Sequence, residues 1–226
     1  MKPESNQDIF NTWDKSQALA DLYRRRAIGS EPETTCALQA SEIVGMEAES
    51  GDSVLDVGCG AGWFARSLQR TGKKLRYFGI DKTELFVRIG QSESRALGIA
   101  PENIVHGEIE HAVGSFNHVV CMNVLSNIDN WHRPLDRMAE IASKTVILRE
   151  SLGESSHYSL VVDKYLDSDR ELKVHVNTYS ISEMTEFMRT RGFTTEIVSD
   201  IRTGGKPEYV IDYLHYWTFA IFRRVR

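Results

Sequence analysis

The stretch that decides the fold is VLDVGCGAG, which runs from Val54 to Gly62. Strand-forming apolar residues surround an acid, three glycines then occupy alternate positions, and an amphipathic segment follows at 63–68. This order predicts a strand, a tight loop and a helix. Glycine has no Cβ, so it suits a loop that turns sharply and lets a ligand approach the backbone amides. We therefore expect a nucleotide-like ligand at this loop.

The spacing of the glycines narrows the class of ligand. A dinucleotide fingerprint needs G-x-G-x-x-G, but counting from Gly58 the third glycine position holds Trp63. No Gly-Lys-Ser/Thr follows either, so a Walker loop is excluded. The remaining pattern, (V/L)-L-D-x-G-x-G-x-G, resembles motif I of the class I S-adenosylmethionine-dependent methyltransferases. The resemblance implies that this loop binds S-adenosyl-L-methionine, with S-adenosyl-L-homocysteine as product, through Asp56, Gly58, Cys59 and Gly60.

A second part of the resemblance lies 25 positions after Asp56. Residues 75–80 (LRYFGI) read as a strand, and Asp81 and Lys82 follow it before a new helical pattern. An ionised acid at this place can accept hydrogen bonds from both hydroxyls of a ribose. We therefore assign Asp81, with Lys82 beside it, to the cofactor site. The alternative is an acid that only favours the N-terminus of a helix.

Two further segments complete the resemblance. In Ile104 to Glu110 (IVHGEIE), the family places an acid near the adenine, which here implies Glu108 with Ile109, although a surface loop is the alternative for Glu108. Residues 116–128 (FNHVVCMNVLSNI) resemble F-D-x-V-x-x-x-x-V-L-x-H-I, the fourth strand and the loop under the cofactor. That match implies cofactor contacts from Asn123 and Val124. Two positions depart from the pattern: Asn117 replaces the usual acid and Asn127 the frequent histidine.

The pattern of the whole chain predicts an α/β fold. Strands are expected at 53–57, 75–80, 104–106, 116–122 and 144–149, with helical patterns between them, which gives a parallel sheet covered on both faces. The resemblance covers about 45–222. It implies a Rossmann-like, doubly wound, mostly parallel seven-stranded sheet in the order 3-2-1-4-5-7-6, with an antiparallel C-terminal edge strand. We expect one domain over 1–226.

Segments at the two ends carry their own signals. The patterns from Ile9 to Ala27 and from Cys36 to Met46 predict N-terminal cap helices within 1–47. In 179–193, Ser180 and Glu183 have the spacing of a capping box, which predicts a helix. Strands are expected at 193–198 and 213–222.

The acceptor site is expected after the fifth strand, where family members build it. Residues 150–180 are too long for a bare turn and are expected to shape that site. His157 and His175 flank this segment, and we predict that one of them is the catalytic base. Surface or structural histidines are the alternative. The predicted acceptor contacts are Glu150, Tyr158 and Tyr179.

Arg24 to Arg26 form a short basic run beside Tyr23. The ordinary interpretation is a solvated helix face. The other is capture of the cofactor's carboxylate, or of an anionic acceptor, by Tyr23 and one arginine.

Composition limits the partners. A net charge of -5 argues against nucleic acid, since its binders usually present a basic face. The sequence shows no apolar stretch of membrane length and no apolar signal core in MKPESNQDIF, so we expect a cytoplasmic protein with no membrane partner. Its cysteines, 36, 59 and 121, are odd in number and scattered, which predicts neither a metal site nor disulfides. A monomer or homodimer is expected.

These features predict an enzyme that transfers a methyl group to an oxygen or nitrogen of a small-molecule acceptor. One alternative is a pseudoenzyme or regulatory module that keeps only the cofactor pocket. A nucleotide-sugar or nicotinamide enzyme is another, and Trp63 in place of the third glycine argues against it. An RNA or protein acceptor is the last.

Overall fold

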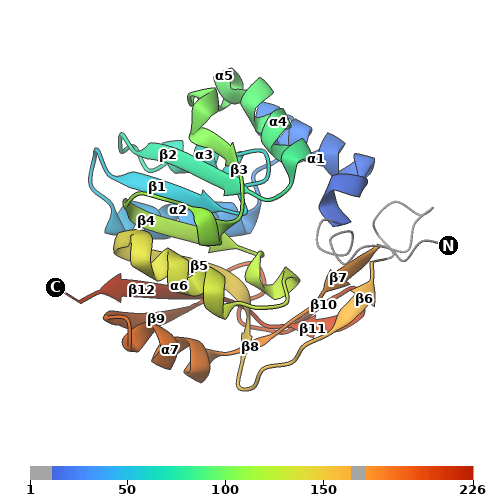
Figure 1. The fold of residues 1–226 in the computed structure, drawn as a ribbon, viewed down its shortest axis with the longest axis vertical. Coiled ribbons are helices and arrows are strands. Elements are labelled where there is room, and N and C mark those ends of the chain that lie inside the picture. The colour runs from blue at the N-terminus through green and yellow to red at the C-terminus, as the bar shows by residue number, and fades with distance from the viewer. Residues whose placement is uncertain (1–11, 164–171, 226) are drawn as a thin grey trace.

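A mostly parallel sheet forms the centre of the molecule (Figure 1). The computed structural model describes residues 12–163 and 172–225. The strands of the sheet lie in the order β3-β2-β1-β4-β5-β12-β9, which confirms the order 3-2-1-4-5-7-6 implied by the resemblance. They are β1 (Ser53–Val57), β2 (Arg76–Asp81), β3 (Ile104–His106), β4 (Phe116–Met122), β5 (Ala142–Gly153), β9 (Phe193–Ser199) and β12 (Trp217–Arg224).

One strand of the sheet, β12, runs opposite to all the others. From β3 to β5 every neighbouring pair is parallel. The antiparallel strand is β12, which runs against both β5 and β9. The strand at the edge of the sheet is β9, which lies next to β12. The antiparallel strand is therefore next to the edge, and it forms an antiparallel pair with the edge strand.

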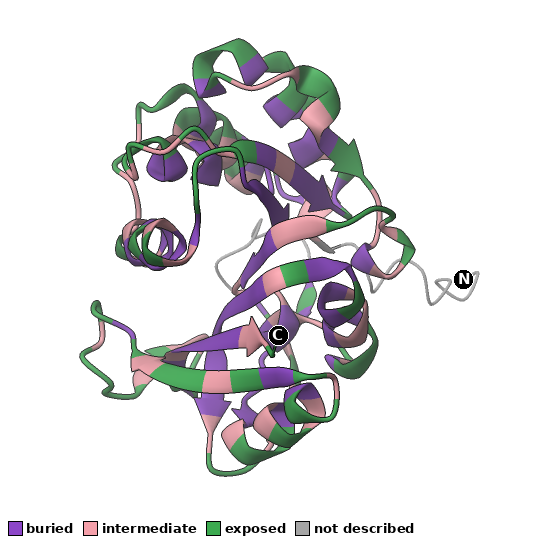
Figure 2. Ribbon diagram, turned by 90° about the vertical axis from the view of Figure 1, so that its left-hand side faces the viewer, coloured by how far each residue is buried: buried purple, intermediate pink, exposed green. Residues whose placement is uncertain are grey.

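Helices cover both faces of the sheet, and the strands are therefore apolar on both sides. Adjacent residues of β5 show this, because Ile147 packs into one apolar cluster while Val146 and Leu148 pack into the other. In Figure 2 burial follows the strands, and the outward sides of the helices are exposed. One face holds α2 (Thr35–Glu47), α3 (Phe64–Gln69), α4 (Glu84–Ser92) and α5 (Ser94–Leu97), and the other holds α6 (His132–Ile141) and α7 (Ile181–Arg189).

The boundaries of most central strands agree with the sequence-based expectation. Strands were expected at 53–57, 104–106 and 116–122, and β1, β3 and β4 occupy those residues. The fifth strand is longer than expected, because β5 continues to Gly153 through pairing with β12 and with β8 (Tyr179–Ser180). Residues 150–153 therefore belong to the sheet rather than to the inserted segment.

The strand expected over 213–222 is divided in two. Ile211 and Asp212 have φ of 51° and 65°, and this turn pairs β11 (Tyr213–His215) with β10 (Glu208–Val210) in a separate hairpin. The chain changes partner at Tyr216, whose N–H donates to Ser151 Oγ at 3.0 Å. A continuous apolar run could not reveal that change of partner.

A second hairpin forms within the predicted insertion. It pairs β6 (Leu160–Val162) with β7 (Lys173–His175), while 164–171 lie outside the described residues. A small apolar cluster joins it to the start of the chain and to the other hairpin, and consists of Leu172, Val174 and Val176 with Trp13, Leu19, Val161 and Ile211. Both hairpins lie beyond the same end of the sheet (Figure 1).

The N-terminal helices pack beside the glycine loop. A short 3-10 turn, η2 (Thr12–Lys15), precedes α1 (Gln17–Ile28), which begins where Ser16 Oγ accepts a hydrogen bond from Leu19 N at 3.3 Å. Tyr23 of α1 stacks on Phe86 of α4, with ring centroids 4.2 Å apart. Ile9 and Phe10, which belong to the predicted helical pattern, lie outside the described residues.

The predicted capping of α7 is confirmed on one side. Ser180 Oγ accepts from Glu183 N at 3.3 Å, as a capping box requires. The second bond of a capping box, from the backbone N–H of Ser180 to the Glu183 carboxylate, is bridged by a third residue. Ser180 N donates to Ser156 Oγ, and Ser156 Oγ donates to the Glu183 carboxylate at 2.9 Å. The helix start is thus tied to the segment after β5.

Over residues 12–163 and 172–225, every helix is too short or too polar to cross a bilayer.

Candidate active site

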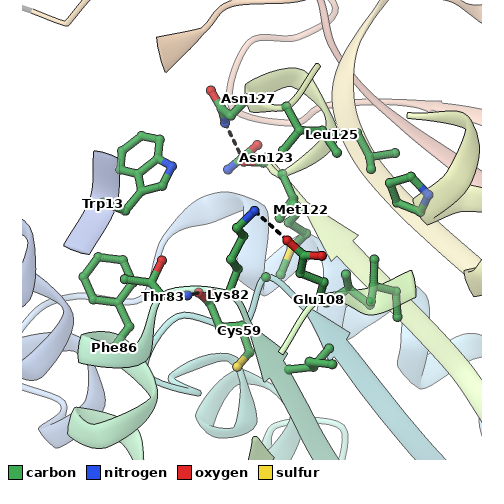
Figure 3. A pocket seen from close by; sticks show the side chains of 18 of the residues that line it. Trp13, Cys59, Lys82, Thr83, Phe86, Glu108, Met122, Asn123, Leu125 and Asn127 are labelled. Atoms are coloured by element: carbon green, nitrogen blue, oxygen red, sulfur yellow. Dashed lines mark hydrogen bonds and ion pairs between the residues drawn. The ribbon is translucent and has the colours of Figure 1, made fainter. Parts of the chain in front are cut away.

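A cavity of about 710 Å³ opens at the carboxyl ends of the central strands. This is the edge at which open α/β sheets bind their ligands. Figure 3 shows Trp13 and Phe86 on one side of the cavity and Asn123, Leu125 and Asn127 on another. The lining also includes residues of the glycine loop, the end of β2, the short turn η4 (Ile109–His111) and β7.

The glycine loop is held in a conformation that requires glycine. Gly58, Gly60 and Gly62 have φ of 70°, 55° and 74°, which side chains rarely tolerate. A Cβ at Gly60 would lie 2.1 Å from the ring of Tyr23, and one at Gly58 would lie 2.2 Å from a methyl of Val124. The glycines thus let α1 and the loop after β4 approach closely.

Asp81 connects the glycine loop to β2. Its Oδ2 accepts from Gly60 N at 2.6 Å, and its Oδ1 accepts from Thr83 N at 2.7 Å. Burial raises the pKa of this carboxyl, and the two amide bonds oppose that effect. Asp81 lines the cavity, and the Thr83 side chain also bonds to its carboxylate. A carboxylate has about four lone-pair sites, so capacity remains to accept a hydroxyl. This geometry fits recognition of a ribose.

Asp56 lies at the end of β1 and lines the same cavity. Its carboxylate accepts from the Tyr77 hydroxyl at 2.8 Å. Burial raises the pKa of Asp56 to about 7, with a further contribution from the charge of Asp81, and the hydrogen bond from Tyr77 only partly opposes this. The site therefore holds a carboxyl group that titrates near neutral pH.

Glu108 and Lys82 form an ion pair at the cavity, with Nζ and Oε1 2.6 Å apart (Figure 3). The hydrogen bond from Lys82 lowers the pKa of Glu108. Both side chains are close to half exposed, while the neighbouring Ile109 is buried. All three predicted residues line the cavity together with Asp81.

The loop after β4 contributes Asn123 and Val124 to the lining. Asn123 has a φ of 58°, in the left-handed region. Its carbonyl accepts from Asn127 Nδ2 at 2.7 Å. Asn127, which stands where the family frequently has a histidine, therefore stabilises the loop through a hydrogen bond within it.

The structure separates the three arginines of the basic run. Arg24 pairs with Glu93 at 2.7 Å and Arg25 with Glu31 at 2.6 Å, both away from the cavity. Arg26 lines the cavity, and its guanidinium lies 5.2 Å from the ring centre of Trp63 and 5.5 Å from that of Tyr23. Burial raises the pKa of Tyr23 to about 12.

The two predicted base candidates have different surroundings. His175, on β7, lines the cavity. His157 is exposed and outside the lining, with Nε2 3.1 Å from Ser155 Oγ and its backbone paired with Thr178. Only His175 is thus placed to meet an acceptor.

The predicted acceptor contacts lie elsewhere. Glu150 is fully buried, since residue 150 is still inside the extended β5, and its carboxylate accepts backbone N–H groups of the loop after β4. Tyr179 is also buried, and its hydroxyl donates to Leu125 O at 2.6 Å. Tyr158 is exposed and packs against the ring of Tyr179. We correct the assignment of Glu150 and Tyr179 as acceptor contacts. Both are buried outside the cavity lining and instead bind the loop after β4, which lines the cavity.

Two remaining predicted residues belong to the loop itself. Gly60 is not in the cavity lining, and it contributes through its bond to Asp81. Cys59 lines the cavity floor with a buried thiol, whose pKa burial raises well above its usual range. Within the described parts of the chain, no group of histidine, cysteine and acidic side chains comes together to hold a metal ion.

Several lining residues escaped sequence reasoning. The missed residues between the end of β4 and the start of α6 lie in or just after the motif at 116–128, so their position in the sequence could have indicated them. The missed residues in η2 and β7 follow no motif, because only tertiary packing brings them to the cavity. The missed residues include Trp13, Met122, Asp129, Asn130, Arg133 and Lys173.

Comparison with known proteins identifies the family. The methyltransferase domain family matches residues 24–198, which is most of the chain. The chain belongs to the class I S-adenosylmethionine-dependent methyltransferases. As in the family, the cofactor is S-adenosylmethionine, and the donor set around Asp81 and the glycine cradle fit it.

The curated relatives of this methyltransferase have different acceptors. The chain is 30% identical over 169 residues to the tRNA U34 carboxymethyltransferase of Haemophilus influenzae strain PittEE, a match that covers 68% of this chain. The match spans 48% of that relative, about half its length. It is 25% identical over 100 residues to the demethylmenaquinone methyltransferase of Geobacillus stearothermophilus, covering 42% of this chain and 43% of the relative.

Solved structures show the same fold at low identity. Magnesium protoporphyrin IX methyltransferase from Synechocystis PCC 6803, crystallised with bound SAM, superposes with a TM-score of 0.60 at 14% identity over 99% of each chain. A S-adenosylmethionine-dependent methyltransferase from Clostridium acetobutylicum ATCC 824 gives 0.61 at 12% identity, over 96% of this chain and all of that one.

Proposed function

We propose that this methyltransferase acts on an oxygen or nitrogen of a small-molecule acceptor. The observation that supports this most is the lining of the cavity, which joins the residues around Asp81 to Trp13, Arg133 and His175 from other parts of the chain. A cavity of about 710 Å³ is in the range of small-molecule sites.

The residues of the chain divide the work between binding and orientation. S-adenosylmethionine supplies a sulfonium methyl group that is already activated for in-line displacement. Asp81 accepts the ribose hydroxyls, Glu108 lies where the family contacts the adenine, and Arg26 is placed to bind the amino-acid carboxylate. Holding the acceptor in line beside the cofactor can account for about 7–11 kcal/mol of the barrier.

His175 is the proposed general base. It comes from β7 and lies in the lining of the cavity, whereas His157 does not. If the acceptor is a hydroxyl, loss of this base should slow turnover about a hundredfold. His157→Asn is the matched control and should leave turnover unchanged.

An RNA acceptor is the second candidate, because one relative is named for action on tRNA. The net charge of -5 weighs against it, since proteins that bind RNA rely on Lys and Arg contacts to phosphate. The basic residues at the cavity are also interspersed with acids, including Glu108, Glu110 and Asp129.

Transfer of a labelled methyl group would test the proposal. The protein would be incubated with methyl-tritiated S-adenosylmethionine and, separately, the small-molecule, RNA and protein fractions of a cell extract. We expect label in the small-molecule fraction, and none with Asp81→Ala. Label in RNA or protein would overturn the proposed acceptor class. Binding without transfer to any fraction would instead support the pseudoenzyme.

A further inference from the structure

The loop after β4 lines the cavity, and this part of the lining is called its floor below. It consists of Asn123, Val124 and the short turn η5 (Leu125–Asn127). Asn123 begins it with a φ of 58°, in the left-handed region, which asparagine adopts more readily than most residues and alanine adopts only with strain. A backbone of this kind persists only where the surroundings hold it.

Glu150 holds the loop from one side. Its Oε1 accepts from Val124 N at 2.9 Å and Leu125 N at 3.0 Å. Its Oε2 accepts from Ser126 N at 2.9 Å and from Ser126 Oγ at 2.7 Å. The carboxylate is fully buried and lies at the amino end of η5, so it satisfies backbone amides that have no partner inside the turn.

Arg149 holds the loop from the other side. Its Nη1 donates to Asn123 Oδ1, and its carbonyl accepts from Asn123 N at 2.8 Å. The guanidinium is itself fixed, because Nε donates to the buried Asp200 at 2.7 Å and the group lies 4.5 Å from the ring centre of Trp217. Arg149 is 2% exposed, so it cannot reach a ligand itself.

The two residues that hold the loop, Arg149 and Glu150, are neighbours on β5. Successive side chains of a strand point to opposite faces, so Arg149 and Glu150 reach the loop from the two faces of the sheet. We infer that Arg149 is a positioning residue, which holds Asn123 in its left-handed conformation and thereby sets the floor of the cofactor cavity. Nothing in this role depends on the identity of the acceptor.

Variants of Asn123 separate the conformation from the side chain. Asn123→Ala removes the acceptor of the Arg149 bond but leaves the Arg149–Asp200 pair intact. Asn123→Gly removes the same bond and adopts positive φ without strain. We expect the affinity for S-adenosylhomocysteine, measured by calorimetry, to fall about tenfold in the alanine variant and at most about twofold in the glycine variant.

A rescue experiment tests Arg149 directly. Arg149→Met should weaken S-adenosylhomocysteine binding about tenfold, and adding Asn123→Gly should restore it to within about threefold while the lowered melting temperature stays low. A purely structural role would leave both properties unrescued, which would overturn the inference. If Arg149→Met does not fold, the comparison of Asn123→Ala with Asn123→Gly tests the inference on its own. Equal affinities of these two variants for S-adenosylhomocysteine would also overturn the inference.

Discussion

The two regions of the cavity are built in different ways. The cofactor region comes from residues within a few positions of strand ends, such as Asp56 near the end of β1 and Asp81 at the end of β2. The acceptor region proposed above draws on η2, the start of α6 and the β6–β7 hairpin, which are far apart in the chain. Trp13 of η2 packs against the cluster around Val174.

This difference shows what a parallel sheet does for a site. Parallel strands bring their carboxyl ends to one edge, so a few residues at each end can specify a binding surface locally. The acceptor region instead depends on an added hairpin and an N-terminal segment, which can change without disturbing the sheet. The predictions below test whether the two regions are as separate as this construction indicates.

The largest effect is expected at Gly60, where α1 meets the glycine loop. Gly60→Ala would place a Cβ 2.1 Å from the Tyr23 ring at a φ of 55°. We expect the free energy of unfolding to fall by about 2–4 kcal/mol, from overpacking and left-handed strain together, with loss of S-adenosylhomocysteine binding. Urea unfolding and calorimetry would measure both.

The matched control is Gly72→Ala, which has a φ of 69° and open space around its Cβ position. It should cost about 1 kcal/mol and leave binding intact. Equal losses in the two variants would contradict the close approach of Tyr23 as the cause.

The next effect concerns the pH dependence of stability. The pKa of Asp56 is raised in the folded protein to about 7, so the folded state binds its proton more tightly than the unfolded chain does. The contribution of this group to stability is therefore present at low pH and is lost as pH rises through about 7. Relative to Asp56→Asn, the wild type should lose about 2 kcal/mol between pH 5 and pH 7 in urea titrations.

If the stability of Asp56→Asn changed with pH in the same way as that of the wild type, the titrating group would not be Asp56. Asp81 is the first to examine, because burial raises its pKa in the same cavity.

A smaller effect is expected at the edge of the cofactor region. Arg26→Met should weaken S-adenosylhomocysteine binding about tenfold, because a charged hydrogen bond to the ligand carboxylate contributes about 1.5–3 kcal/mol. Arg24→Met serves as the control, since Arg24 pairs with Glu93 away from the cavity. If the two variants bind equally well, Arg26 does not hold the carboxylate.

The smallest effect on cofactor binding is expected from the acceptor region. His175→Asn should change the S-adenosylhomocysteine dissociation constant by no more than about twofold, since His175 comes from β7 and not from the strand ends that carry Asp56 and Asp81. His157→Asn provides the comparison outside the cavity. A tenfold loss in His175→Asn alone would show that the two regions are coupled.

The same division explains what the sequence could reveal. The strand–loop–helix order was predictable because local patterns fix it, whereas the sheet order came from the resemblance to the methyltransferase family. Asp81 could be singled out because it ends a strand. Glu150 and Tyr179 were misassigned, since the length of β5 depends on pairing with β12 and β8, which no local pattern shows. Arg26 could be singled out from Arg24 and Arg25 only by seeing which side of α1 faces the cavity.

The most direct test of the account is thermal denaturation with S-adenosylmethionine, S-adenosylhomocysteine or NAD, on the wild type and on Asp81→Ala. A ligand at about a hundred times its dissociation constant should add about 2.7 kcal/mol, or about 5–10 °C for a chain of this size. We predict that shift with the two adenosyl ligands only, and its loss in Asp81→Ala. A shift with NAD instead, or an undiminished shift in Asp81→Ala, would contradict the assignment of the glycine loop and Asp81 as the cofactor site.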